Sequence, residues 1–165
     1  MKAFKYTSEK QTKILTAFWI VLMLLCLCLI MYFDDGDYFL AWVIAMFFSL
    51  IILMVLSIPR EVILSDKSLN IKCILDYTTI PYNTITSIRV ISTKKPLFMP
   101  IFASFGFFGF FGYYLNLRNG EILNVYASRL HNLIEICNKY DEKYIVSVPL
   151  PQIEEFVGLV KDQIK

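Results

Sequence analysis

Residues 14–33 read ILTAFWIVLMLLCLCLIMYF, and residues 38–58 read YFLAWVIAMFFSLIILMVLSI. Neither stretch contains a charged residue, and each has the length of about 20 residues that an α-helix needs to cross the hydrocarbon of a bilayer. Leu, Ile, Val and Phe, which insert favourably at the middle of a membrane, make up most of both stretches. The two stretches therefore predict two transmembrane helices.

The segment between the two stretches is acidic and short, Asp34-Asp35-Gly36-Asp37. A carboxylate at the centre of a bilayer costs roughly 2.5–3.5 kcal/mol, so three of them have to lie outside the hydrocarbon. The sequence thus predicts a transmembrane helical hairpin with one polar turn.

The charges that flank the hairpin predict its orientation. Cationic side chains stand on both outer flanks, whereas the connecting turn has none: Lys2, Lys5, Lys10, Lys13 and Arg60. Because such flanks stay in the cytoplasm, we expect residues 1–13 to be a cytoplasmic N-terminal segment. The expected protein is a multi-pass protein of the cell membrane with both termini cytoplasmic.

A signal peptide is the alternative for residues 1–33. Its apolar region normally spans about 7–15 residues and ends in small residues at a cleavage site. Here the apolar run is 20 residues long and ends in Met31-Tyr32-Phe33. This pattern favours a transmembrane helix that stays in the protein over a signal peptide that is cleaved off.

Residues 60–165 predict one compact domain of about seven β-strands closed by a C-terminal helix. Strand patterns cover residues 61–64, 69–75, 85–91, 113–118, 121–126, 132–137 and 143–148, with 78–81 leading into the third of these. Asn119-Gly120 predicts a two-residue type I′ turn that would place Arg118 opposite Glu121. A single apolar stripe after Pro151 predicts the helix: Ile153, Phe156, Val157, Val160 and Ile164.

The segment from Pro96 to Leu117 (PLFMPIFASFGFFGFFGYYLNL) is also uncharged. Pro100 and three glycines disfavour a third membrane-spanning helix. Three interpretations remain open: a long loop that enters a strand, an aromatic loop in the membrane interface, and a re-entrant or spanning segment. The candidate residues for contact with membrane or partner are Lys94, Lys95, Phe102, Phe105, Phe107 and Phe108.

No catalytic, cofactor-binding or metal-binding residues are predicted. The net charge of +2 indicates no nucleic-acid partner, and the sequence has no nucleophile elbow, phosphate-binding loop or dinucleotide fingerprint. The four cysteines are scattered, which is typical of a reducing compartment. One histidine, His131, stands at an expected turn. The sequence therefore predicts a protein that is not an enzyme and needs no cofactor.

Two stretches, GFFGFFGYYLNLRNGEILNVYAS (residues 106–128) and KYIVSVPLPQIEEFV (residues 143–157), resemble the bacterial pleckstrin-homology (PH) domain family. The resemblance covers roughly residues 60–160. Similar family members join one or two transmembrane helices to a PH-like domain of two roughly orthogonal sheets and a C-terminal helix. Residues 146–149 (VSVP) depart from the family pattern, in which Ile-Ser-Pro precedes an acidic turn.

The resemblance implies an α+β protein with a membrane anchor, in which the hairpin precedes a PH-like β-sandwich or barrel of about seven strands. Phosphoinositide binding is not carried over, because Lys94 and Lys95 are the only adjacent cations in the first half of the domain. We expect a non-enzymatic interaction module at the cytoplasmic membrane surface, with the lipid bilayer and a protein partner or a second copy as its contacts. The alternatives are a membrane-lipid or envelope-stress sensor and an accessory subunit of a membrane transport complex.

Overall fold

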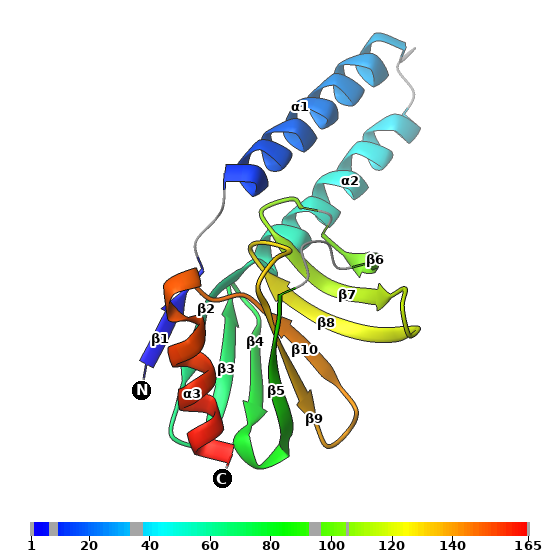
Figure 1. The fold of residues 1–165 in the computed structure, drawn as a ribbon. Coiled ribbons are helices and arrows are strands. Elements are labelled where there is room, and N and C mark those ends of the chain that lie inside the picture. Colours follow the sequence, from blue (N-terminus) through cyan, green and yellow to red (C-terminus); the bar gives the residue numbers. More distant parts are fainter. Residues whose placement is uncertain (1, 7–9, 34–37, 93–96, 105, 165) are drawn as a thin grey trace.

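A computed structural model of the chain describes residues 2–6, 10–33, 38–92, 97–104 and 106–164. It contains a β-rich domain, two helices that extend from one end of this domain, and a third helix along its side (Figure 1). The helices are α1 (Lys10–Phe33), α2 (Tyr38–Leu56) and α3 (Ile153–Ile164). Helices thus cover both apolar stretches, and the C-terminal helix is confirmed.

Helix α1 is long and apolar enough to cross a membrane. Its window Thr12–Leu29 has a mean hydropathy of 2.3, and only 11% of this window is buried. The helix is therefore not the core helix of the domain. The apolar stretch within α2, Trp42–Leu53, is shorter.

Ten strands form two sheets among the described residues, and nine of them follow α2, where about seven were predicted. The first sheet has the order β1-β2-β3-β4, and the second has the order β5-β9-β10-β8-β7-β6. The strands are β1 (Lys2–Lys5), β2 (Pro59–Leu64), β3 (Ser68–Cys73), β4 (Tyr77–Pro81), β5 (Ile85–Ile91), β6 (Phe98–Ala103), β7 (Phe110–Asn116), β8 (Glu121–Ala127), β9 (Leu133–Asn138) and β10 (Lys143–Val146). Short 3₁₀ turns, η1 (Tyr82–Thr84) and η2 (Leu150–Gln152), precede β5 and α3.

Strand β1 was not predicted, because four residues are too few to show a periodic pattern. It pairs antiparallel with β2, from Lys2 opposite Leu64 to Lys5 opposite Glu61. One further hydrogen bond, from the Tyr6 amide to the Arg60 carbonyl oxygen at 3.0 Å, continues this pairing. The two ends of the segment that carries α1 and α2 are therefore held against each other.

The turn between β7 and β8 differs from the predicted two-residue loop. Asn116, not Arg118, lies opposite Glu121, and the Gly120 amide donates to the Asn116 carbonyl oxygen at 2.8 Å. The Asn116 side-chain oxygen also accepts from the Arg118 amide at 3.1 Å. Of the predicted pair Asn119-Gly120, only Gly120 has a positive φ, whereas a type I′ turn needs a positive φ at both positions. The prediction of a type I′ turn is therefore wrong, and the observed turn is longer and is stabilised by a side chain.

Residues 98–103 form a strand, so the expectation of a long loop is wrong for this part of the phenylalanine-rich segment. β6 pairs with β7 at the end of the sheet, and the register shifts between Pro100 and Phe102. An edge strand with a bulge tolerates proline because one side of the strand needs no amide donor. The paired strands also exclude a spanning helix at residues 98–103 and 110–116.

The main core lies between the two sheets and α3. Its fully buried members come from strands of both sheets and from the helix stripe, and they include Phe4, Val62, Leu69, Ile71, Ile80, Ile134, Ile136, Val146, Phe156 and Val160. A second cluster around Tyr114, Leu123 and Ile145 is formed by strands of the larger sheet. Strand β1 thus contributes to the main core through Phe4.

Substituting Phe4 tests whether β1 belongs to the fold. Its side chain is 1% exposed, and its ring meets Phe156 edge-on at 5.1 Å between centroids. We expect Phe4→Ala to cost about 3–5 kcal/mol and to lower the melting temperature of the detergent-solubilised full chain by about 6 °C or more.

The matched control is Phe102→Ala, because Phe102 is 78% exposed. This variant should shift the melting temperature by about 2 °C or less, as surface substitutions usually do. Equal small shifts in both variants would contradict the packing of β1.

Candidate functional site

The described residues between β6 and β7 form a turn with aromatic side chains. We call Ser104 and residues 106–109 the aromatic turn. The Ser104 amide donates to the Phe111 carbonyl oxygen at 2.8 Å. The Ser104 hydroxyl lies 2.7 Å from the carbonyl oxygen of Phe107 and 3.0 Å from that of Gly109. These contacts define the shape of the turn from within.

The aromatic turn is held by the first turns of α1. The Phe108 amide donates to the Thr16 hydroxyl oxygen at 2.9 Å, and the Thr16 hydroxyl donates to the Thr12 carbonyl oxygen at 2.8 Å. The Thr12 hydroxyl donates to the Ser128 carbonyl oxygen at 2.7 Å. Both threonines are buried. The turn therefore lies beside the beginning of the apolar helix.

The structure brings two of the six predicted contact residues together. The rings of Phe107 and Phe108 meet at 4.7 Å between centroids with an interplanar angle of 80°, and Phe108 is 44% exposed. Phe102 lies on the edge strand β6 and is exposed. The remaining three, Lys94, Lys95 and Phe105, lie outside the described residues.

An exposed apolar surface continues from the aromatic turn along the edge of the larger sheet. Its side chains come from β6, β7 and β8 and from the residues that flank them: Leu97, Met99, Ile101, Phe102, Tyr113, Leu117 and Ile122. Of these residues only Phe102 was predicted from the sequence. The alternation of side chains along a strand does not show whether another part of the protein covers that strand.

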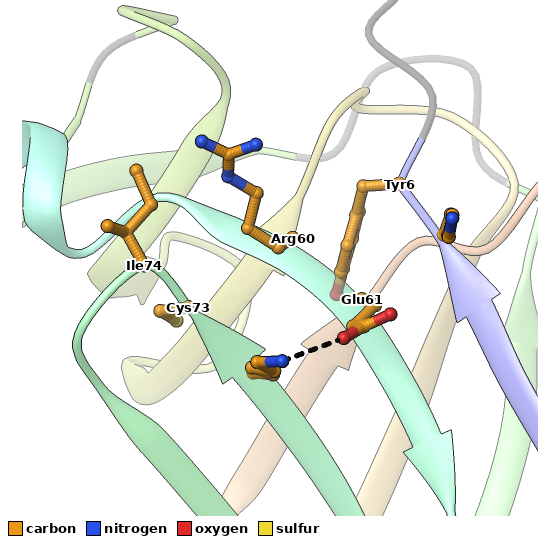
Figure 2. Close-up of a pocket in the computed structure, with 7 residues that line it drawn as sticks. Tyr6, Arg60, Glu61, Cys73 and Ile74 are labelled. Atoms are coloured by element: carbon orange, nitrogen blue, oxygen red, sulfur yellow. Dashed lines mark hydrogen bonds and ion pairs between the residues drawn. The ribbon is translucent and has the colours of Figure 1, made fainter.

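A second feature, a charged surface pocket of about 510 Å³, lies at the end of the first sheet next to α2 (Figure 2). Its lining comes from β1, β2, β3 and the residues just beyond them: Lys5, Tyr6, Arg60, Glu61, Lys72, Cys73 and Ile74. Sequence reasoning missed this pocket, because its residues come from three separate parts of the chain. We call it the basic pocket.

The basic pocket is cationic at neutral pH. Lys72 pairs with Glu61 at 3.2 Å between Nζ and Oε1, and Lys5 and Arg60 add two further positive charges. Burial raises the pKa of the Cys73 thiol to about 11, and the Asp76 carboxylate adds to this shift. Burial likewise raises the pKa of Tyr6, whose hydroxyl donates to the Tyr126 carbonyl oxygen at 2.8 Å. Neither group offsets the positive charge.

The arrangement of these side chains is that of a binding surface. Among the residues that the structure describes, no three His, Cys, Asp or Glu side chains gather as a metal site would require. The pocket instead offers hydrogen-bond donors with positive charge, and the aromatic turn offers apolar rings.

A comparison with protein families matches residues 60–161 to the family described as Bacterial PH domain. The matched residues make up more than half of the chain and include β3 to β10 and most of β2 and α3. The chain belongs to the bacterial PH domain family. Searches of the curated proteins and of the solved structures found no match. PH domains are generally non-catalytic modules that bind lipids or proteins.

The PH domain match begins at Arg60, so it does not include β1, although β1 completes the first sheet. The basic pocket therefore joins residues inside the matched region with Lys5 and Tyr6 outside it.

Gly112 controls the close approach of β6 to β7, and its replacement tests the position of the aromatic edge. Its φ is +108°, and an added Cβ would lie 2.5 Å from the Phe102 carbonyl oxygen. We expect Gly112→Ala to separate the two strands, because a backbone atom cannot move aside alone. Amide hydrogen exchange in residues 98–103 should rise by tenfold or more, as roughly 1.4 kcal/mol of lost local stability would produce.

Gly120→Ala is the matched control for this substitution. Its φ is also positive, at +72°, but no atom lies within 4 Å of the added Cβ. Exchange in residues 98–103 should then stay unchanged. A similar rise in both variants would show that the conformational cost, rather than the close approach, is responsible.

Proposed function

We propose that this chain is a membrane-anchored, non-catalytic PH module that acts at the cytoplasmic surface of the cell membrane. The proposed anchor is a transmembrane hairpin of residues 14–33 and 38–58, and the PH domain of residues 60–165 takes β1 as an additional strand. The observation that supports it most is the hydrogen bond between the Tyr6 amide and the Arg60 carbonyl oxygen.

This hydrogen bond restricts the number of membrane crossings. Tyr6 and Arg60 belong to one sheet, so they must be on the same side of any membrane. The segment between them therefore crosses an even number of times. In the proposed anchor, α1 crosses the membrane and α2 returns the chain to the first side. The lysines before α1 favour the cytoplasm as that side.

The anchor also places the domain close to the bilayer. Arg60 follows Leu56, the last residue of α2, by four positions, and an extended chain of this length spans at most about 14 Å. At the other end, α1 begins at Lys10 and contacts the domain through Thr12 and Thr16.

The partner of the proposed module is a protein or a second copy of the chain that meets it at the membrane surface. The apolar surface along β6, β7 and β8 is available for such a contact.

Topology reporters test the anchor. We expect green fluorescent protein fused after Lys165 to fluoresce, because it folds in the cytoplasm. Alkaline phosphatase inserted after Gly36 should be active, because this position would lie outside the cell. Both reporters are measured in intact bacterial cells.

The control is the same alkaline phosphatase inserted after Asp66, in the turn between β2 and β3. It should be inactive, because the PH domain is expected in the cytoplasm. An inactive enzyme after Gly36 combined with a soluble, fluorescent chain would contradict the anchor.

A second candidate function is membrane-lipid sensing through the aromatic turn. The hydrogen bond between the Phe108 amide and Thr16 supports it, because Thr16 lies within the apolar window of α1. An aromatic ring held at this level would lie in the membrane interface, where such rings partition well.

Tryptophan quenching tests this contact in liposomes. In a chain whose two native tryptophans are changed (Trp19→Phe and Trp42→Phe), we expect the fluorescence of Phe108→Trp to be quenched severalfold more by brominated lipids than that of Tyr140→Trp. Tyr140 is a suitable control because it is an exposed aromatic residue in the turn after β9. Equal quenching at both positions would contradict the contact.

A further inference from the structure

We propose that the exposed face of β6, β7 and β8 binds the same face of a second copy of the chain, so that two anchored modules form a symmetric dimer. The inference rests on the proposed function, in which the partner is a protein or a second copy. It names that partner and the surface through which the two copies meet.

The register of the three strands places exposed apolar side chains on one face. Met99 lies opposite Leu115, and Leu115 lies opposite Ile122, so their side chains share a face of the sheet. Alternate residues along each strand extend this face. More than half of the residue surface is exposed in six of its members, which we call the apolar face: Leu97, Met99, Phe102, Tyr113, Leu117 and Ile122.

The other face of the same strands belongs to the core. Tyr114 and Leu123 lie in the second buried cluster and are 1% and 2% exposed. An antiparallel sheet with one buried face commonly has polar side chains on its other face. Here both faces are apolar, and residues 97–117 contain no charged residue. With about 200 Å² for each large side chain, the apolar face exposes roughly 600–700 Å², which is more than the largest apolar patch of most monomers.

The size and the lack of charge of the apolar face suit a contact between two copies. Together they would bury about 1,300 Å², which is within the range of about 1,200–2,000 Å² for specific interfaces. In a twofold contact a surface meets its own copy, so a charge would meet the same charge. A face without charge is therefore self-complementary. The proposed anchor also keeps all copies in one membrane with one orientation, which raises their local concentration.

The edge of β6 disfavours lipid hydrocarbon as the occupant of this face. β6 is the last strand of the larger sheet in the described part of the chain. The Leu117 amide donates to the Leu97 carbonyl oxygen at 3.0 Å, so in the next pair, Phe98 opposite Asn116, the Phe98 amide and carbonyl groups point away from β7. Open sheet edges do not occur in hydrocarbon, because such groups would lack hydrogen-bond partners there. Water or protein has to contact this edge.

The same edge indicates how the two copies would meet. Pro100 lies opposite Tyr114, two positions after Phe98, and its nitrogen carries no hydrogen. A strand added to β6 would therefore miss one hydrogen bond, as is typical of edges that resist strand pairing. We expect the copies to contact each other through the side chains of the apolar face, with β6 not extended by a further strand.

Photocrosslinking in membranes tests the proposal. The full chain is expressed in bacterial cells as two copies with different epitope tags, and both carry benzoylphenylalanine in place of Tyr113. After illumination we expect a product of twice the chain mass that carries both tags. The control position is Tyr140, an exposed tyrosine in the turn after β9, and its yield of this product should be at least tenfold lower.

A charge on the apolar face tests the same contact from the opposite direction. Ile122→Lys would place an ammonium group on each side of the contact, so it should lower the yield from position 113 tenfold or more. Leu159→Lys is the matched control, because Leu159 is an exposed apolar residue of α3, on the other side of the domain from β6, β7 and β8 (Figure 1). It should leave the yield unchanged. Both variants should keep the melting temperature within about 2 °C of the wild-type value.

Three outcomes would overturn the proposal. Equal yields at positions 113 and 140 would show random collision, and a position-113 adduct with lipid alone would show that the membrane covers the face. An adduct with a protein that carries neither tag, in place of the dimer, would show a different partner. The comparison of positions 113 and 140 is decisive even if Ile122→Lys fails to fold. Any of these results in a chain that passes the reporter test contradicts only the dimer, whereas failure of the reporter test contradicts the anchor.

Discussion

The pairing of β1 with β2 is the constraint on which the rest of the structure depends. Hydrogen bonds between these strands connect residues 2–6 with residues 60–64, and the whole segment that carries α1 and α2 lies between them. This pairing buries Phe4 against Phe156 of α3, so the N-terminus becomes part of the core of the PH domain. The helices are thus an insertion between neighbouring strands rather than an appendage with a free linker.

The same constraint brings chemically different surfaces to one end of the domain. The aromatic turn is fixed to α1 through Thr16, and the basic pocket lies where α2 enters β2. Apolar rings and cationic side chains suit the two layers of a membrane surface, the upper hydrocarbon and the charged headgroups. The aromatic turn belongs to the larger sheet, and the basic pocket lies on the smaller one.

Much of the fold could be predicted from local patterns. The apolar runs predicted both N-terminal helices, the alternation around Ile71 and Val125 predicted strands, and the stripe from Ile153 to Ile164 predicted α3. The family resemblance over residues 60–160 agrees with the matched residues 60–161. The candidate site was predicted less completely, because Phe107 and Phe108 could be named but not placed beside Thr16, which is distant in the chain.

The sequence by itself determined where apolar helices and strands form, since hydrophobic spacing acts over a few residues and is visible in one window. Only the tertiary structure decided that four N-terminal residues form a strand, that Asn116 closes the β7–β8 turn, and that Pro100 lies in an edge strand. It also decided that Lys5, Arg60 and Lys72 share one pocket. The physical reason is that strand pairing is chosen by burial and hydrogen bonding between distant segments, and no local pattern records the partner.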